Sequence, residues 1–252
     1  MHECGCDLTG QTAVVTGASR GIGSAIARGL LRGGADVVTL QRAKPGTELE
    51  DVASAAGRRL THYGVDLAAE ESIQDVAESV LAEAQVDILV NNAGTQIRGE
   101  AVDFPLDDLD ATMDINVRAV FQLCQLFGAP MVERRRGKIV NLASMLSFQG
   151  GIRTPAYAAS KGAVVQLTKA LCNEWAAHGV NVNAVAPGYL ATDMTEALRA
   201  DSSRNQEISA RIPAARWGTP DDVAGPVVFL ASAAADYVNG AVIPVDGGWL
   251  VR

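Results

Sequence analysis

Short runs of β-branched residues alternate with longer segments of helical periodicity along almost the whole chain, and this alternation constrains the fold more than any other feature. The runs that we expect to form strands are 12–16, 36–40, 61–66, 87–91, 138–143, 180–186 and 241–245. Each of the first six is followed by a segment with helical periodicity. Continuous apolar strands separated by helices are typical of a parallel sheet covered on both faces. The alternation therefore predicts a doubly wound α/β fold with a parallel sheet of about seven strands.

The chain shows no sign of a division into two domains. No Pro-, Gly- or Ser-rich linker, charge block or repeat interrupts the alternation. The chain has 252 residues, of which 48% are hydrophobic, so its length allows one large core or two small ones. We therefore expect residues 1–252 to form a single domain.

Charge and composition exclude several classes of protein. A net charge of −8 and a pI near 4.9 argue against a nucleic-acid partner and against binding to anionic membranes. No apolar run is long enough to span a membrane, and the first residues lack the basic and apolar regions of a secretory signal. We expect a cytoplasmic protein that does not bind membranes.

The cysteines are too few and too scattered to form a disulfide framework, and we expect reduced thiols at Cys4, Cys6, Cys124 and Cys172. His2, Cys4 and Cys6 could together approach a metal ion, but the cluster lacks a clear fourth ligand. We therefore predict no metal site.

A glycine-rich turn follows the first predicted strand. The sequence "VVTGASRGIGSAIARGL" places Gly17, Gly21 and Gly23 between this strand and the next helix. Glycines allow close backbone approach, and a helix N-terminus offers free N–H groups to a diphosphate. The spacing differs from both Gly-x-Gly-x-x-Gly and the P-loop, so by itself it also fits ordinary turn chemistry. Its position between strand and helix favours a nucleotide cradle.

Tyr157 and Lys161 lie four positions apart in "TPAYAASKGAVVQLTK", an otherwise apolar helical segment of small residues. Residues at this spacing share one helical face, and a nearby ammonium lowers the pKa of a phenol from about 10. The pair therefore indicates a proton shuttle, although Tyr157 could also pack in the core while Lys161 extends to solvent. Two features favour the shuttle: Ser144 follows the fifth strand in "NLASM", and Asn116 interrupts the apolar helix "MDINVRAVF".

Two more motifs fall at carboxyl ends of predicted strands: "NNAG" at 91–94 and "APGYLATDM" at 186–194. Together with the glycine turn, Ser144 and the Tyr157/Lys161 pair, in this order, they make the chain similar to the short-chain dehydrogenase/reductase family. The resemblance extends from Leu8 to Trp249. It implies a Rossmann-like fold, a nicotinamide cofactor, and hydride transfer to or from a carbonyl or secondary alcohol.

The resemblance also implies a role for each matching residue. Tyr157 would be the general acid and base, and Lys161 would lower its pKa and hold the nicotinamide ribose. Ser144 would bind the substrate carbonyl oxygen, and Asn116 would hold a water that relays protons. Besides Tyr157 and Lys161, the expected cofactor-binding residues are Gly17, Ser19, Arg20, Gly21, Ile22, Gly23, Gln41, Arg42, Asp66, Leu67, Asn92, Ala93, Gly94, Pro187, Gly188 and Thr192.

The choice between NAD and NADP stays open at this point. NAD-specific proteins usually carry a carboxylate at the end of the second strand, where this chain has Gln41 followed by Arg42. Arg42 and Arg20 could pair with a 2′-phosphate, or they could simply be solvated. This charge pattern favours NADP, whereas the resembling branch of the family is commonly NAD-linked, so we expect NAD(P).

The less general segments resemble the branch of the family that acts on sugar acids of the 2-dehydro-3-deoxy-D-gluconate or deoxygluconate type. These segments are 143–157, 211–218 and the C-terminal "DYVNGAVIPVDGGWLVR". The candidate substrate-binding residues are Arg98, Met145, Gln149, Arg153 and Arg216. Each arginine could instead form a surface ion pair. The alternatives are a 3-oxoacyl-carrier-protein reductase, a gluconate 5-dehydrogenase and, disfavoured by the intact catalytic set, a dinucleotide-binding sensor.

The last expectations concern motion and assembly. The polar stretch 195–213 follows the nicotinamide-binding motif, so we expect a mobile substrate lid around 190–217. The predicted helices 109–136 and 155–178 are apolar on more than one face, and the C-terminus ends in "WLVR". Because relatives in the family are usually tetramers, we predict a homotetramer, with burial within the monomer as the alternative.

Overall fold

The computed structural model describes residues 5–252, and its centre is one sheet of seven parallel strands. Their spatial order is β3-β2-β1-β4-β5-β6-β7. The strands are β1 (Thr12–Thr16), β2 (Asp36–Gln41), β3 (Leu60–Gly64), β4 (Ile88–Asn91), β5 (Gly137–Leu142), β6 (Val180–Pro187) and β7 (Val242–Val245). The predicted doubly wound α/β fold is confirmed, with each strand within two residues of its expected bounds.

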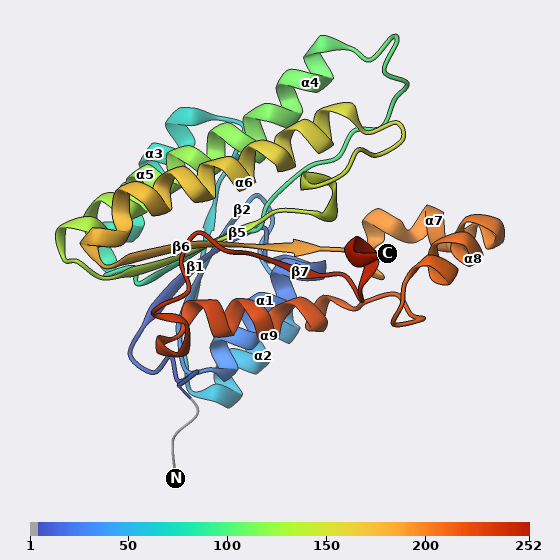
Figure 1. Cartoon of the computed structure of the whole chain (residues 1–252). Helices are drawn as coiled ribbons and strands as arrows, with labels where there is room; N and C mark the ends of the chain where they lie inside the picture. The colour runs from blue at the N-terminus through green and yellow to red at the C-terminus, as the bar shows by residue number, and fades with distance from the viewer. Residues whose placement is uncertain (1–4) are drawn as a thin grey trace.

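Helices cover both faces of the sheet (Figure 1). On one face lie α3 (Glu70–Glu83), α4 (Leu106–Met113), α5 (Ala119–Glu133) and α6 (Pro155–Trp175). On the other lie α1 (Gly21–Arg32), α2 (Thr47–Ala56) and α9 (Pro220–Ala231). The segment after β6 forms α7 (Glu196–Ala200) and α8 (Ser202–Arg211), which extend beyond the strand ends.

Two apolar cores follow from this layering. Consecutive strand residues point to opposite faces, so neighbouring residues of β1 enter different cores. Val14 packs in the cluster on the α3, α5 and α6 side, whereas Ala13 and Val15 pack in the cluster with α1 and α9. All three side chains are fully buried. This is why the strands read as continuous apolar runs in the sequence.

The segment predicted as one helix over 109–136 is divided in the structure. A π-helical turn, Asp114–Arg118, separates α4 from α5. Such turns are rare and occur often at functional sites. This one carries Asn116, whose side chain is fully buried at the strand ends.

The chain order reverses direction beside β1, because β2 lies on one side of it and β4 on the other. In doubly wound sheets, ligands bind at the carboxyl ends of the strands next to such a reversal. The motifs identified in the sequence lie at this edge, on the right in Figure 1.

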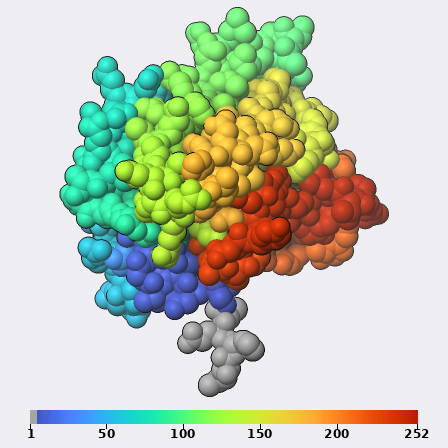
Figure 2. Space-filling model, turned by 60° about the vertical axis from the view of Figure 1, so that its left-hand side comes forward, coloured from blue at the N-terminus to red at the C-terminus, as the bar shows by residue number. Residues whose placement is uncertain are grey.

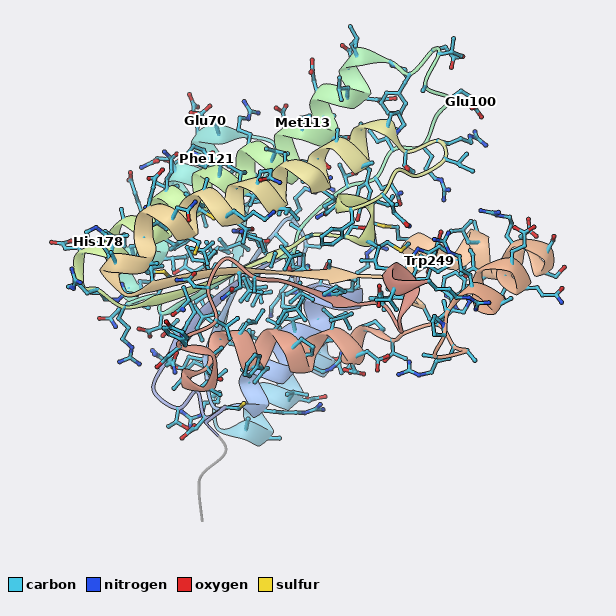
Figure 3. All side chains as sticks on the ribbon, viewed as in Figure 1. Glu70, Glu100, Met113, Phe121, His178 and Trp249 are labelled. Carbon is cyan, nitrogen blue, oxygen red and sulfur yellow. The ribbon has the colours of Figure 1, made fainter. Side chains whose placement is uncertain are left out.

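The C-terminal apolar cluster, expected at a subunit interface, is divided in the structure. Trp249 is only 5% exposed and packs within the chain, as in the alternative of burial within the monomer, whereas Val251 is 88% exposed. Its ring centroid lies 4.7 Å from that of Tyr189, and the Arg211 guanidinium stacks over it at 3.9 Å. Figure 3 shows Trp249 where the C-terminal turn meets the α7–α8 region. Packing against these neighbours explains its apolar character without a partner chain.

Apolar side chains do remain on the outside of the molecule. Phe121 projects from the outer surface of α5, 38% exposed (Figure 3). In the space-filling view, α6 and the C-terminal part of the chain lie next to each other on one face (Figure 2). Their closeness is direct, since a Cβ on Gly240 would lie 3.1 Å from the sulfur of Cys172 on α6.

Candidate active site

The glycine turn after β1 has the shape of an anion cradle. A Cβ on Gly23 would lie 2.1 Å from the Gly17 carbonyl oxygen, so only glycine fits there. Gly21 begins α1 with a φ of 56°, and a Cβ there would meet nothing within 4 Å. Its N-cap, Arg20, makes no side-chain cap hydrogen bond, and no acidic residue lies in the first turn. The N–H groups of this first turn are therefore left without a side-chain cap and fit a diphosphate.

The "NNAG" segment after β4 is bonded to this turn. The amide of Asn92 donates to the carbonyl oxygens of Thr16 and Gly17 at 2.9 and 3.0 Å. The Thr16 hydroxyl in turn accepts from the backbone of Asn92 and Ala93 at 3.0 and 2.9 Å. Asn92 thus positions the glycine turn, and Thr16 is a supporting residue that the sequence analysis did not identify. Its only signal in the sequence is its place directly before Gly17.

Gln41 and Arg42, the two residues at the end of β2 that we expect to determine the preference for NAD or NADP, lie in different environments. Gln41 is 6% exposed; its amide oxygen accepts from the Ala18 backbone, and its amide nitrogen donates to the Ala43 carbonyl at 2.9 Å. Gln41 is therefore committed to holding the glycine turn. Arg42 is exposed to solvent beside it. Arg20, the other candidate, forms an exposed ion pair with Asp193 at 2.9 Å.

The two remaining adenosine-side candidates lie after β3. Asp66 is exposed, and its carboxylate accepts from the Ala68 backbone at 3.1 Å. Leu67 next to it is buried among the apolar residues on the α3 side. Ser19 is exposed on the glycine turn, and Ile22 packs partly against the core beneath it. Their roles toward a cofactor stay predictions.

The structure brings three of the predicted catalytic side chains together. Lys161 Nζ lies 5.7 Å from the centre of the Tyr157 ring, one helical turn away on α6. The same ammonium donates to the Leu142 carbonyl oxygen at the end of β5 at 2.5 Å. Ser144, two residues further along the chain, hydrogen-bonds with Tyr157 through its hydroxyl. The end of β5 and the first turns of α6 thus form one polar site.

Burial determines the protonation of the pair. It lowers the pKa of Lys161 from 10.5 to about 8, because the ammonium loses hydration. Burial raises the pKa of Tyr157, and the hydrogen bond with Ser144 opposes this rise. In the structure burial outweighs the lowering by Ser144, and the predicted lowering of the tyrosine pKa by Lys161 stays a prediction. Tyr157 is therefore a neutral phenol that can donate a proton.

Two serines that the sequence analysis missed connect this site. The Ser147 hydroxyl accepts from the Ser144 backbone at 3.2 Å and donates to the Lys161 carbonyl at 2.7 Å. The buried Ser160 hydroxyl donates to the Tyr157 carbonyl at 2.8 Å. Ser147 forms a capping box with Ser144, so the Ser-x-x-Ser spacing was a usable signal.

Asn116 was expected to hold a water, and its side chain instead bonds within the chain. Its amide oxygen accepts from the Thr95 backbone at 2.8 Å, and its amide nitrogen donates to the Thr95 carbonyl at 2.9 Å. The same nitrogen donates to the Ser160 hydroxyl at 3.0 Å. The side chain therefore joins the loop after β4 to α6, and the water-holding role stays a prediction. A Cβ on Gly94 would lie 3.2 Å from the Asn116 oxygen, which keeps this junction tight.

The predicted nicotinamide side is formed by the end of β6. Gly188 follows Pro187, and its N–H donates to the Val245 carbonyl at 3.0 Å. A Cβ at Gly188 would lie 2.6 Å from the Asp246 Cβ, so the backbones of the two strand ends are in contact. Thr192 begins a 3₁₀ turn, Asp193–Thr195, in a capping box with Thr195. This turn leads into α7 and α8.

The predicted substrate arginines are in different settings. Arg153 pairs with Glu100 at 3.1 Å, and Arg216 binds both oxygens of Asp222 at 2.7 and 2.8 Å. Arg98 is exposed on the loop after β4. Both ion pairs match the surface-pair alternative, so neither guanidinium is free for a substrate carboxylate in this arrangement.

The other two substrate candidates flank the Ser144 loop. Met145 is 6% exposed and packs in an apolar cluster with Ile208, Ile212 and Trp249, so it supports the site by packing. Gln149 lies further along the same loop, in its partly exposed section. Its side chain makes no hydrogen bond within the described part of the chain, and its role stays a prediction.

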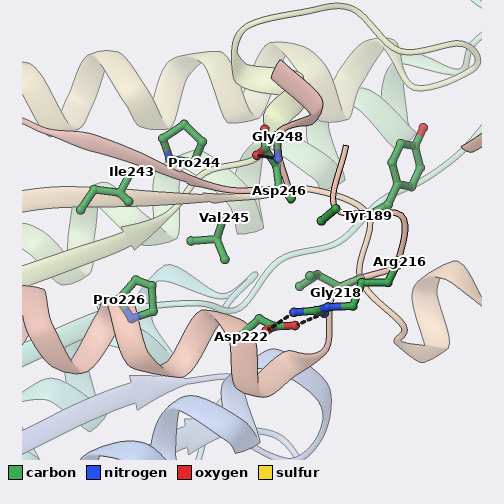
Figure 4. Close-up of a pocket in the computed structure, with 13 residues that line it drawn as sticks. Tyr189, Arg216, Gly218, Asp222, Pro226, Ile243, Pro244, Val245, Asp246 and Gly248 are labelled. Atoms are coloured by element: carbon green, nitrogen blue, oxygen red, sulfur yellow. Dashed lines mark hydrogen bonds and ion pairs between the residues drawn. The ribbon is translucent and has the colours of Figure 1, made fainter. Parts of the chain in front are cut away.

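A cavity of about 420 Å³ lies between β7 and the start of α9 (Figure 4). Arg216 and Asp222 line it, whereas Ser144, Tyr157 and Lys161 do not. The ring of Tyr189 turns away from it (Figure 4). Arg216 therefore lies beside this cavity and not beside the catalytic pair.

The possible metal cluster of His2, Cys4 and Cys6 lies mostly outside the described residues, which include only Cys6. Within residues 5–252, no group of three or more His, Cys, Asp or Glu side chains could hold a metal ion. No helix in the same range is long and apolar enough to cross a membrane. Cys6, Cys124 and Cys172 are free thiols.

Comparison with known proteins agrees with this geometry. A family model described as enoyl-(acyl carrier protein) reductase matches residues 17–250. The 2-dehydro-3-deoxy-D-gluconate 5-dehydrogenase of Bacillus subtilis (strain 168) is 49% identical over 252 residues, covering 100% of this chain and 99% of the relative.

Two solved structures are also similar over nearly all of the chain. One, assigned as a 2-deoxy-D-gluconate 3-dehydrogenase from Agrobacterium tumefaciens with bound NADP, has a TM-score of 0.93 and 49% identity, and covers 99% of this chain and 100% of its own. The other, assigned as an NAD(P)-dependent gluconate 5-dehydrogenase from Beutenbergia cavernae with NADP at low occupancy, has a TM-score of 0.95 and 50% identity, with coverages of 98% and 100%. The chain belongs to the short-chain dehydrogenase/reductase family.

Proposed function

We propose that this chain transfers a hydride between NAD(P)(H) and a carbonyl or secondary alcohol of a sugar acid. The observation that carries the proposal is the joint placement of Ser144, Tyr157 and Lys161 at the carboxyl edge of the sheet, beside the glycine turn. The relative from Bacillus subtilis, 49% identical, is named for a sugar acid of this kind, which supports the substrate class.

The residues of the chain account for the proton chemistry. When bound, the nicotinamide supplies or accepts the hydride. The Ser144 hydroxyl and the Tyr157 phenol hold the substrate oxygen, and Tyr157 donates its proton there during reduction. In oxidation Tyr157 accepts the proton back. Lys161 stabilises the phenolate left after donation and binds the nicotinamide ribose.

The glycine turn, the "NNAG" segment and the end of β6 would hold the cofactor along the strand ends. The exposed Arg42 forms no ion pair among residues 5–252, so it is free to meet a 2′-phosphate at the end of β2. Two similar structures contain NADP, which agrees with this charge argument. We therefore propose NADP as the preferred form, with NAD accepted.

A 3-oxoacyl-carrier-protein reductase is the second candidate, since a structure of this activity is 32% identical with a TM-score of 0.91. The acidic surface argues against docking of an acidic carrier protein. Gluconate 5-dehydrogenase is the nearer alternative within the sugar acids, and one such relative, from Gluconobacter oxydans, is 41% identical.

A substrate panel tests the proposal. The purified protein is assayed with keto and hydroxy sugar acids and with an acetoacetyl thioester, each with both nicotinamide cofactors. We expect the highest kcat/KM on a deoxygluconate-type or gluconate-type acid. A higher kcat/KM on the thioester would replace the proposal with the carrier-protein reductase. Retention of most of the activity by Tyr157→Phe would contradict the proposed role of Tyr157.

We further propose that residues 1–252 act as one domain with 190–217 as the substrate lid, in a cytoplasmic homotetramer. Free thiols and a soluble nicotinamide cofactor favour the cytoplasm. The exposed Phe121 on α5 supports an interface on the outer face of α5 and α6. Light scattering tests the assembly: we expect about four times the single-chain mass of 26.3 kDa, and Phe121→Glu should reduce it. A monomer mass would refute the tetramer.

A further inference from the structure

The arginines of the lid, residues 190–217, differ in how they are engaged. Three of the four have partners within the chain: Arg204 with Glu207 at 2.6 Å, Arg211 over the ring of Trp249 at 3.9 Å, and Arg216 with Asp222 at 2.7 Å. The fourth, Arg199 on α7, has no carboxylate or aromatic partner among residues 5–252.

Arg199 also carries a donor that its surroundings leave unpaired. Its Nη2 reaches the Thr192 carbonyl oxygen at 3.4 Å, which is a long contact. Its Nε is shielded from solvent and has no hydrogen-bond partner within the described chain. A shielded donor without an acceptor is destabilising. Arg58 and Arg134 share this property, but they precede β3 and β5 at the amino ends of strands, whereas Arg199 follows β6 at the carboxyl edge, where ligands bind. An acceptor on a bound molecule would remove this penalty.

Arg199 lies between the turn that follows the nicotinamide motif and the apolar cluster that includes Met145. Its guanidinium contacts the backbone of Thr192, in the turn that follows the nicotinamide motif. Its neighbour Leu198 packs against the cluster of Met145, Ile208, Ile212 and Trp249, and Met145 directly follows Ser144. The helix that carries Arg199 is therefore anchored, through Leu198, on the cluster that includes Met145.

A second donor in this cluster has the same property. The indole Nε1 of Trp249 is buried and has no hydrogen-bond partner among residues 5–252. Both groups are donors, so a molecule that satisfies either of them must bring an acceptor. A carboxylate is acceptor-only and negatively charged, and it matches an arginine better than a neutral hydroxyl does.

We infer that Arg199 is the lid residue that binds the carboxylate of the substrate and thereby selects acids over neutral ketones. This inference rests on the proposed sugar-acid activity. It differs from the expectation for Arg153 and Arg216, which are neutralised by Glu100 and Asp222. Arg98 has no comparable constraint, because it is exposed and water can satisfy its donors.

The test compares Arg199→Ala with Arg204→Ala, which removes another lid arginine that contacts only an exposed glutamate. Each protein is assayed with the sugar acid and with a neutral ketose of similar length. For Arg199→Ala we expect kcat/KM on the acid to fall by roughly 30- to 300-fold, mainly through KM, as for loss of a charge-assisted hydrogen bond. On the neutral ketose we expect less than about a threefold change. Arg204→Ala should match the wild type on both.

Two further measurements keep the outcome specific. Added guanidinium should restore part of the activity of Arg199→Ala on the acid but not on the ketose. Cofactor affinity, measured by fluorescence titration, should stay within about twofold of the wild type, as expected of a residue that does not touch the cofactor. Equal losses on acid and ketose, no loss on the acid, or weakened cofactor binding would each overturn the assignment. A wild type that uses no sugar acid would instead refute the proposed function, and the inference with it.

Discussion

The catalytic edge around α6 and the lid at 190–217 hold their polar residues in opposite ways. At the catalytic edge the polar side chains are buried: Asn116 and Ser160 are 0% exposed and Lys161 is 5% exposed. In the lid, ion pairs lie on the surface, as in the Arg20–Asp193 pair, whose side chains are 78% and 71% exposed. Chemistry needs atoms fixed to a fraction of an ångström, whereas a lid must open and close. The buried residues of the catalytic edge are therefore suited to the reaction itself, and the exposed residues of the lid to selecting the substrate.

The catalytic edge, which is the rigid side of this comparison, is supported by a chain of buried amide side chains. Asn91 on β4 donates to the Asn141 oxygen on β5 at 2.9 Å, and Asn141 donates to the Thr168 hydroxyl on α6 at 3.0 Å. These bonds join two central strands to the helix that carries Tyr157. Buried, paired networks of this kind fix one geometry because breaking one member leaves others unsatisfied.

The largest effect should come from the centre of the rigid side. Tyr157→Phe removes the proton donor and keeps the ring, so kcat should fall by about 10² to 10⁴. Cofactor affinity and the unfolding midpoint should change little, since the phenol oxygen is used only in the chemical step. Stopped-flow assays and fluorescence titration measure both. A variant with most of its activity left would contradict the mechanism and with it the distinction between the two regions.

A smaller effect, on the cofactor preference, is expected at the end of β2, where the exposed Arg42 follows the buried Gln41. Arg42→Asp replaces a partner of the 2′-phosphate with a repelling charge, so the preference for NADP over NAD should shift by about 2 to 4 kcal/mol. The ratio of kcat/KM for the two cofactors gives the answer. Lys44→Asp, further along the same loop, controls for the local change of charge, since its ion pair with Glu50 at 2.9 Å is exposed on both sides and its loss should cost little. An unchanged ratio would mean that Arg42 only faces water.

The sequence predicted the rigid side far better than the lid. Strand positions and the Ser144, Tyr157 and Lys161 set follow from local patterns, because β-branched runs and residue spacing encode them. The ion pairs of Arg153 and Arg216 could not be predicted, because their partners are set by the folded surface. Nor could the burial of Trp249, since it depends on Tyr189 and Arg211 meeting it in space.

The charge on the catalytic helix has a consequence for stability at alkaline pH. Burial lowers the pKa of Lys161 to about 8 from 10.5, which disfavours the folded state by about 3 kcal/mol below pH 8. Between pH 8 and 10.5 the unfolded chain holds a proton that the folded chain has lost, so stability rises with pH.

Lys161→Met tests this, since methionine has no proton to lose. Urea unfolding from pH 7 to 10 should show the wild type gaining up to about 3 kcal/mol relative to the variant as the pH rises. The variant should be inactive at every pH, because the ribose and phenolate partner is gone. A stability difference that does not change with pH would mean that Lys161 is more hydrated than its burial indicates. The catalytic edge would then be less desolvated than its contrast with the lid assumes.

The smallest effect should come from the lid. Asp193→Asn removes the charge that Arg20 meets at 2.9 Å, but both side chains are mostly exposed. The free energy of unfolding should therefore change by less than about 1 kcal/mol, and less still at high salt. Because the pair joins the glycine turn to the first turn of the lid, the change should speed lid opening and frees Arg20 for a phosphate. The KM for NADPH should accordingly fall at low salt and match the wild type at about 0.5 M salt, where exposed charges are screened.

Glu196→Gln, one turn away and without an ion pair within residues 5–252, controls for the loss of a lid carboxylate. A loss of stability well above 1 kcal/mol in Asp193→Asn would mean that the lid is held as firmly as the catalytic edge, and the contrast between the two regions would fail.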